Sequence, residues 1–297
     1  MAKGYFYGGQ AVIEGVMMRG QKAVVTVVRR PGGGLAMNTR LLSSLYTGWV
    51  RKTPFLRGII VLIEALVLGI KSLLYSANVS LEEDQEEISG WLIGVIVTLG
   101  LGLAVLLFFL APLFLTRLLA PFVTSSIVFH VIEGAIRVII FVAYLKLLAL
   151  VPDIKRLFAY HGAEHKAVNA HEAGVPLEME AIRRYDTAHV RCGTSFMFIV
   201  LVIAILVFAV VGLPSLWLMI LSRIVLIPVI AALGYEVTHF GARHNKNIFV
   251  RAILAPGMWL QSLTTRQPDD SQLEVAVTAL RKAVEIDQGV PAAEAAG

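Results

Sequence analysis

The chain has 297 residues, of which 57% are hydrophobic and 16% are charged, whereas soluble domains carry about 25% charged residues. A soluble protein with so few charges would expose large apolar patches and aggregate. An ordinary cytosolic enzyme and a disordered tail protein are therefore excluded. Cys192 is the single cysteine, so a disulfide scaffold is excluded as well. The net charge of +5 fits the retention of Lys and Arg on the cytoplasmic side of membranes, and no basic and aromatic pattern indicates nucleic-acid binding.

Four stretches approach the roughly 20 apolar residues that a membrane span needs, namely 91–115, 127–151, 195–211 and 216–232. A fifth stretch, 58–74, is shorter and contains Glu64 and Lys71. If this stretch does not span, 22 Lys and Arg residues lie on one side of the membrane and Arg117 alone lies in the opposite loops. If it spans, the two sides carry 10 and 12 Lys and Arg residues, and this even distribution does not follow the positive-inside rule. We therefore predict four spans, both termini in the cytoplasm, and a re-entrant or interfacial helix at 58–74.

The fold class predicted is a mainly α, polytopic membrane protein with a small cytoplasmic β-hairpin. The segments are 1–57, a cytoplasmic N-terminal segment with the hairpin; 58–90, the re-entrant or interfacial helix and an acidic loop; 91–151, the first two spans; 152–193, a cytoplasmic loop; 194–240, the last two spans; and 241–297, a cytoplasmic tail. The N-terminus lacks an apolar core, so no cleaved signal peptide is expected.

Three smaller elements are predicted on the cytoplasmic side. A β-prone run and a Pro-Gly-Gly-Gly turn place the hairpin at 22–39. The pattern of 154–172 predicts a helix that stops at Gly174. In the tail, Ser271 and Glu274 form a predicted capping box that opens an amphipathic helix, and residues after Asp287 are predicted to be disordered.

The strongest chemical signal is the pattern His161-Gly-Ala-Glu164-His165. On a helix, positions i and i+4 share a face, so the two imidazoles could chelate one divalent metal ion. Glu164 would lie beside them as a general base, as in the inverted zincin arrangement.

Catalytic zinc takes three protein ligands and leaves one position open, so a third ligand is required. The candidates are Glu172, Glu236, His189 and Cys192. Glu236 lies near the cytoplasmic end of the fourth span, and His189 and Cys192 flank the start of the third. Cys192 could also be a thiolate nucleophile or a buried structural residue.

The second span carries a polar stripe. His130, Glu133 and Arg137 lie on a single helical face, and Glu133 and Arg137 are spaced to pair. Ionisable groups in a span usually face the bundle interior or a wet cavity. The stripe is therefore either a polar pathway or a buried ion pair that fixes helix packing.

Four motifs resemble the YqhQ-like family of bacterial membrane proteins. They are GGQAVIEGVMMRG at 8–20, YHGAEHK at 160–166, HVRCGTSF at 189–196, and PGMWLQSLTTRQPDD followed by EVAV at 256–277. The resemblance runs from about residue 5 to residue 285. It implies a multi-pass protein of the bacterial inner membrane and a predicted metal-dependent enzyme. The positions that match the family motifs are Glu14, Arg19, His161, Glu164, His165, Lys166, His189, Arg191, Cys192, Gly193, Thr194, Ser195, Tyr235 and Glu236.

Two functions follow from this sequence. The first is a metal-dependent hydrolase with zinc as a candidate ion, bound by His161 and His165 with Glu236 or His189 as third ligand. Glu164 would be the base, and Arg191 or Lys166 would hold an anionic group of a membrane-associated peptide, lipid headgroup or isoprenoid phosphate. The second is a non-enzymatic insertion or assembly factor for other membrane proteins, or a transporter. In both, the lipid bilayer is the expected partner, and the oligomeric state is left open.

Overall fold

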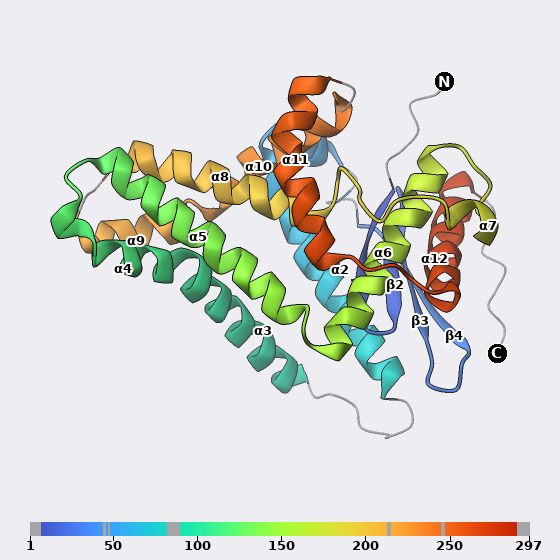
Figure 1. The fold of residues 1–297 in the computed structure, drawn as a ribbon. Coiled ribbons are helices and arrows are strands. Elements are labelled where there is room, and N and C mark those ends of the chain that lie inside the picture. Colours follow the sequence, from blue (N-terminus) through green and yellow to red (C-terminus); the bar gives the residue numbers. More distant parts are fainter. Residues whose placement is uncertain are drawn as a thin grey trace.

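The fold was analysed in a computed structural model, which describes residues 7–43, 46, 48–81, 90–212, 215–244 and 247–289. Long helices form a bundle at one end of the molecule, and a small sheet covered by helices forms the other end (Figure 1). The prediction of a mainly α, polytopic protein is confirmed. Two predicted segments, the acidic loop after Leu81 and the tail after Gly289, lie outside the described residues.

The N-terminal part is a four-stranded antiparallel meander in the order β1-β2-β3-β4. The strands are β1 (Gly8–Val12), β2 (Gly15–Arg19), β3 (Ala23–Arg29) and β4 (Leu35–Leu41). The predicted hairpin at 22–39 corresponds to β3 and β4. The glycine-rich stretch before it, for which no element was predicted, folds into a second hairpin, closed by a turn in which Glu14 has a φ of 49°.

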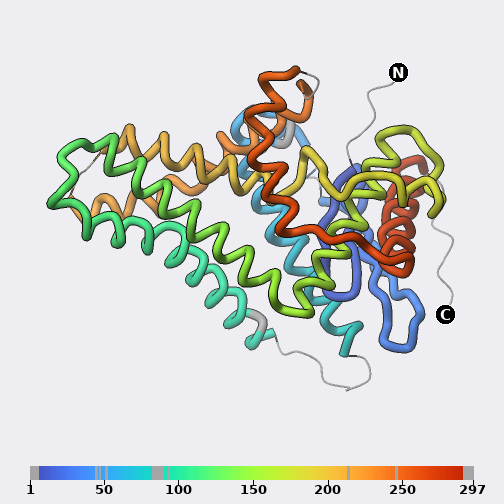
Figure 2. Tube along the Cα trace, viewed as in Figure 1, coloured from blue at the N-terminus to red at the C-terminus, as the bar shows by residue number. Residues whose placement is uncertain are grey.

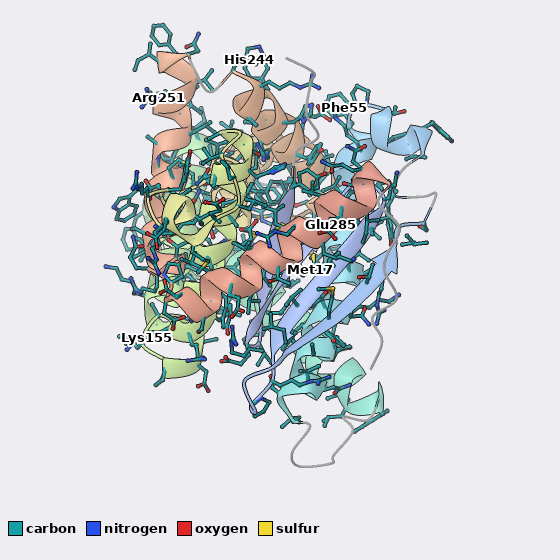
Figure 3. The ribbon with its side chains drawn as sticks, turned by 90° about the vertical axis from the view of Figure 1, so that its right-hand side faces the viewer. Met17, Phe55, Lys155, His244, Arg251 and Glu285 are labelled. Carbon is teal, nitrogen blue, oxygen red and sulfur yellow. The ribbon has the colours of Figure 1, made fainter. Side chains whose placement is uncertain are left out.

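The sheet is buried on both faces, because its apolar residues alternate between two cores. On one face Val16 and Val25 pack against α6 (Pro152–Glu172) and α12 (Asp270–Gln288). On the other face Met17 and Val24 pack against α2 (Leu56–Ser80). Figure 3 shows α12, with Glu285, crossing the strands near Met17.

Helix α2 turns several small and polar residues inward, and some of its leucines face outward. Buried Ser72 accepts a hydrogen bond from Thr26 Oγ1 at 3.0 Å, and buried Glu64 pairs with Arg19 at 2.9 Å. Leu66 and Leu73, in contrast, are 44% and 40% exposed. This inverted distribution suits a helix that has protein on one side and lipid on the other.

The bundle consists of two helical hairpins whose connecting ends lie far from the sheet (Figure 2). In the first, α3 (Gly90–Val105) continues through a π-helical turn, η2 (Leu106–Leu110), into α4 (Ala111–Arg117) and is followed by α5 (Ser126–Leu148). In the second, α8 (Gly193–Val211) is followed by α9 (Leu216–Val225) and α10 (Ile227–Arg243). The other elements are η1 (Trp49–Lys52), η3 (Ala120–Phe122), α7 (Met179–Ile182) and α11 (Ile248–Thr264).

Among the described residues, four helices are long and apolar enough to cross a membrane, or five if α9 and α10 count as one span. The span predicted at 216–232 is bent in the structure, because α9 and α10 meet at an angle of 48°. Pro228 lies in the first turn of α10, where its ring interrupts the helical hydrogen-bond ladder. Helix α2 has 25 residues, longer than the predicted 58–74, and lies across the sheet end of the bundle (Figure 1).

The two helices that cover the sheet have clear local signals. Helix α6 begins with Pro152 and Asp153 in its first turn and is followed by Gly174 at a φ of 72°. Helix α12 has a capping box, but it is formed by Asp269 and Gln272 and not by the predicted Ser271 and Glu274. The reason is register: Asp269 Oδ1 accepts the backbone N–H of Gln272 at 2.9 Å, so the helix starts earlier than predicted.

Candidate metal centre

Helix α6 brings the three residues of the His-x-x-Glu-His pattern to one place. The imidazole rings of His161 and His165 have centroids 4.4 Å apart. The side chains of His165 and Glu164 are 2% and 6% exposed. The predicted pairing of the histidines on one helical face is therefore observed.

Cys192 completes a group with these histidines. Its Sγ lies 3.4 Å from His161 Nε2, and one ligand atom from each of His161, His165 and Cys192 lies within 4.8 Å of the others. Cys192 is the N-cap of α8, where its Sγ accepts the N–H of Thr194.

Both histidines are oriented by backbone carbonyl groups on their far side. His161 Nδ1 donates to Thr264 O at 2.9 Å, and His165 Nδ1 donates to Thr187 O at 2.5 Å. A carbonyl oxygen can only accept, so the proton of each neutral ring lies on Nδ1 and Nε2 is left as a ligand. Histidines that bind metal ions are usually held in this way, and the two nitrogens and one thiolate are a donor set that suits zinc.

Glu164 lies between the histidines and the edge of the sheet. Its Oε2 is 3.5 Å from His165 Nε2. On its other side the carboxylate touches β1: a Cβ added to Gly9 would lie 3.0 Å from Glu164 Cγ and 3.3 Å from Oε1. The carboxylate is thus next to the ligand atoms, where it can accept a proton or act as a further ligand.

His189, one of the predicted ligands, has both ring nitrogens in other contacts. Nδ1 accepts the N–H of Arg191 at 3.4 Å, and Nε2 faces Glu172 Oε2 at 3.5 Å. Glu172 also pairs with Arg191. Burial by itself would raise the pKa of Glu172, but the hydrogen bonds from His189 and Arg191 outweigh it and lower the pKa to about 2. These residues brace the loop before α8.

Two other predicted site residues, Glu236 and Lys166, also have partners away from the group. Glu236 accepts hydrogen bonds from Arg57 Nε at 2.8 Å and from the N–H of Phe55 at 3.0 Å. Lys166 donates to the carbonyl oxygens of Arg183 and Tyr185, at 2.9 and 2.6 Å. Each of these contacts joins two elements of the fold, so Glu236 and Lys166 are positioned as structural links.

Glu14, in the β1–β2 turn, folds onto the histidine helix. It pairs with Arg156 Nη2 at 2.7 Å and accepts the hydroxyl of Tyr160 at 3.1 Å. Burial and the charge of Glu14 raise the pKa of Tyr160 above its usual value, so the hydroxyl stays a donor. These contacts fix β1 alongside α6.

The polar stripe of the second span is a buried cluster inside the bundle. Glu133 pairs with Arg137 at 2.6 Å and with Arg223 at 2.6 Å, and His130 Nδ1 lies 3.2 Å from it. Arg137 Nε also donates to Phe108 O in the π-helical turn, where a carbonyl oxygen is freed from the regular ladder. Every one of these polar side chains is at most 1% exposed.

Sequence reasoning missed three residues that organise these sites. Arg223 donates to Glu133 Oε2 at 2.6 Å and so completes the buried cluster. Thr264 supplies the carbonyl oxygen that orients His161, and Gln261, 0% exposed, donates to His189 O at 2.8 Å and to Ser195 Oγ at 2.6 Å. The signal available for Arg223 and Gln261 was a strongly polar residue inside an apolar helical run.

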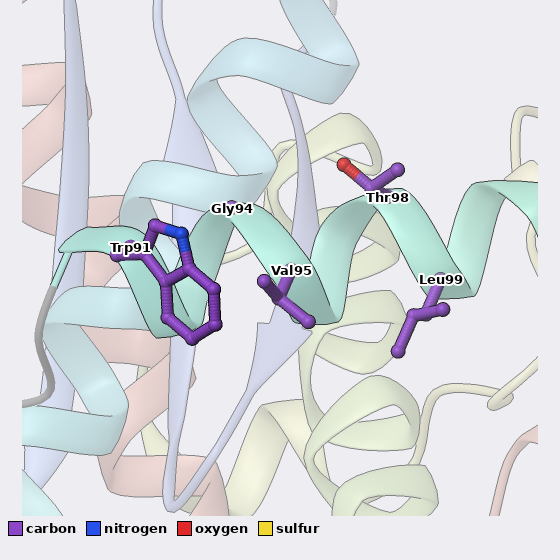
Figure 4. A pocket seen from close by; sticks show the side chains of 5 residues that line it. All are labelled: Trp91, Gly94, Val95, Thr98 and Leu99. Atoms are coloured by element: carbon purple, nitrogen blue, oxygen red, sulfur yellow. The ribbon is translucent and has the colours of Figure 1, made fainter.

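Two shallow pockets on the bundle are lined by residues other than those of the candidate metal centre. One shallow pocket, on α3, is lined by Trp91, Gly94, Val95, Thr98 and Leu99 (Figure 4). Thr98 provides the only side-chain hydroxyl among these residues. An apolar surface of this kind on an exposed helix suits contact with lipid tails.

Comparison with known proteins gives one family and one relative. The family described as "Protein of unknown function (DUF1385)" matches residues 53–286. The "Uncharacterized protein YqhQ" of Bacillus subtilis (strain 168) is 33% identical over 301 aligned residues, which cover 95% of this chain and 93% of the relative. No solved structure matches the chain.

Proposed function

The chain belongs to the DUF1385 family, and from the geometry of its site we propose that it is a metal-dependent hydrolase of the bacterial inner membrane. It acts at the cytoplasmic face on a membrane-associated substrate. The observation that carries this proposal is the group of His161, His165 and Cys192, with both Nδ1–H groups held by carbonyl oxygens.

The residues of the group have distinct roles. His161, His165 and Cys192 would hold the ion, and a zinc ion there would polarise a substrate carbonyl or phosphoryl group and acidify water. Glu164 takes a proton from the attacking water and returns it to the leaving group as the bond to that group breaks. Its position beside His165 Nε2 supports this role.

The proposed orientation of the helices across the membrane is supported by a hydrophobic core that the sheet shares with α6 and α12. Val16 and Val25 of the sheet pack with Ala163 of α6 and Leu280 of α12, so these elements lie on one side of the membrane. The chain between the sheet and α6 must therefore cross an even number of times. In the proposed arrangement, the α3–α4 segment and α5 make these two crossings and α2 lies at the interface, in agreement with the charge distribution.

The non-enzymatic alternative, an insertion or assembly factor or a transporter, requires polar side chains that are open to a client or solute. The Glu133 cluster does not favour it, since its carboxylate and both guanidinium groups are satisfied by one another. The cluster suits helix packing.

Metal content tests the proposal directly. The protein purified in detergent is expected to hold about one ion per chain, and the His165→Ala and Cys192→Ala variants are expected to lose it. His189→Ala and Glu236→Gln are matched controls, because both residues have other partners, and they are expected to retain the ion. A metal-free protein after expression with added zinc, manganese or iron would contradict the proposal and favour the alternative.

The role of Glu164 has its own test. Glu164→Gln keeps the size of the side chain but cannot accept a proton as a carboxylate does. We expect this variant to retain the ion and to lose biological activity in a complementation assay. Full activity of Glu164→Gln would exclude it as the base.

A further inference from the structure

The edge of the sheet beside the metal centre carries unpaired backbone groups. Strand β1 is the first in the order β1-β2-β3-β4 and pairs with β2 alone. The N–H of Arg29 donates to Glu14 O, so Glu14 hydrogen-bonds toward β3. Along an antiparallel strand, successive residues bond alternately to the strands on either side. Val16 and Met18 therefore also bond toward β3, and the residues between them bond toward β1, namely Gly15, Met17 and Arg19. Their partners on β1 are Val12, Gln10 and Gly8.

Consequently Gly9 and Ala11 direct their N–H and C=O groups away from the sheet. Within the described chain, these groups have no hydrogen-bond partner. The same edge is closed at both ends, because Tyr7 O accepts from Arg191 Nη2 at 3.2 Å and the N–H of Ile13 donates to Ser76 Oγ at 3.2 Å. The open part of the edge is therefore short and has defined limits.

The open edge adjoins the proposed site. Successive residues of a helix are rotated by about 100°, and α6 turns Ala163 and Ala167 into the core that it shares with α12. Glu164 follows in rotation and faces Gly9, and His161 and His165 come next in the same direction of rotation, away from Ala163. A strand added to β1 would lie about 4.8 Å from it, on the side toward which the histidines turn.

Glycine at position 9 is required by this contact. A Cβ there would lie 2.4 Å from Met17 O and 3.0 Å from Glu164 Cγ. At position 8 a Cβ would meet no atom within 4 Å. The two glycines leave the exposed start of β1 without side chains, so its backbone is accessible next to Glu164.

We propose that the open edge of β1 at Gly9 and Ala11 binds an extended peptide segment of a membrane-associated substrate protein as an added strand, and presents it to Glu164 and the metal centre. The inference rests on the proposed hydrolase function and names peptides as its substrate class. Main-chain hydrogen bonds provide affinity in this mode of recognition. The hydrolysed bond is a peptide C–N bond: water adds to the carbonyl carbon, Glu164 receives the water's proton, and the proton leaves with the amine.

Binding can be measured without catalysis. The probe is a short fluorescein-labelled peptide of alternating threonine and valine with a lysine at each end, titrated by anisotropy against the full chain in nanodiscs. The control is the same peptide with every amide N-methylated, which cannot pair with a strand edge. We expect the first peptide to bind and the second not to. Equal binding of both, or of neither, would overturn the inference.

The edge itself is tested with Ala11→Pro. Proline removes the outward N–H of Ala11 but no bond to β2, and edge strands tolerate proline in such positions. We expect the dissociation constant of the probe to rise by about tenfold, which corresponds to one lost main-chain hydrogen bond of about 1.4 kcal/mol. Ala11→Ser keeps the N–H and is the matched control. An unchanged constant for a folded Ala11→Pro protein would contradict the proposal.

A second measurement does not depend on how Ala11→Pro folds. Gly8→Cys places a thiol at the edge without steric conflict, and Gly32→Cys places one in the β3–β4 turn, which is equally open. A probe with an N-terminal bromoacetyl group is expected to alkylate Gly8→Cys faster than Gly32→Cys. The unlabelled peptide is expected to slow the reaction of Gly8→Cys, because it competes for the same edge. Equal alkylation rates for the two variants would overturn the proposal. A disulfide-linked dimer of Gly8→Cys that excludes the probe would also overturn it, because the edge of β1 would then pair with a second copy of the chain.

The two proposals fail separately. His165→Ala is expected to lose the ion and still bind the probe, since the edge of β1 does not include the histidine. A protein that holds metal but does not bind the probe would sink the peptide proposal alone. A protein that binds the probe but holds no metal would sink the hydrolase proposal and leave only the binding of a peptide at the edge of β1.

Discussion

Glu133 of α5 and Arg223 of α9 lie 2.6 Å apart, and their side chains are 1% and 0% exposed. The pair joins the two helical hairpins of the bundle. Arg137 contacts the same carboxylate at 2.6 Å, and both guanidinium groups lie over the ring of Phe208, at 5.2 and 4.1 Å from its centroid. One carboxylate is therefore shared by two buried guanidinium groups.

This arrangement predicts an unequal effect of removing the partners. Glu133→Leu leaves two buried arginines without an anion and is expected to lower the free energy of unfolding by about 3–5 kcal/mol. Arg223→Leu leaves Glu133 paired with Arg137 and is expected to cost less. Thermal unfolding of both variants in detergent measures the difference. Equal or reversed costs would mean that the cluster does not balance its charge in this way.

A second prediction separates Cys192 from the other candidate ligands. Cobalt in place of zinc should give a near-ultraviolet absorption band from sulfur-to-metal charge transfer, because Cys192 belongs to the group. The band is expected to disappear in Cys192→Ser and to persist in Glu236→Gln, whose carboxylate is used by Arg57. If Glu236→Gln loses the cobalt, the sequence-based choice of Glu236 as third ligand is correct.

A third prediction concerns pH. The pKa of Glu172 is lowered to about 2 in the folded protein, from an ordinary value near 4.5, so its stabilisation is present above pH ~4.5 and is lost as pH falls toward 2. Its side chain is 29% exposed, so about 1–3 kcal/mol is expected after solvent screening. Melting temperatures measured from neutral to acidic pH should fall less steeply for Glu172→Gln. Parallel curves for the two proteins would refute this role.

A fourth prediction concerns the arrangement across the membrane. In a chain without Cys192, cysteine at Ser215 between α8 and α9 should react with an impermeant maleimide in intact cells. Cysteines at Gly32 in the sheet and at Glu178 after α6 should react only after permeabilisation. If Gly32 and Glu178 label from opposite sides, α2 crosses the membrane and the shared core is wrong.

The sequence by itself determined the membrane class, most of the spans and the histidine helix. Apolar runs of sufficient length and the i, i+4 spacing of His161 and His165 are local properties, and each element can be inferred from its own residues. The asymmetry of Lys and Arg also gave the orientation that the topology experiment tests.

Only the tertiary structure decided which distant residues meet. Cys192 joins His161, which lies 31 positions away along the chain, while Glu236 and His189 contact other partners, because ligand choice depends on how α6, α8 and α11 pack. The second hairpin at 8–20 was missed for the same reason. Its strands are stabilised by two cores, formed with α6 and α12 on one face and α2 on the other, and such non-local burial leaves no short-range pattern in the sequence.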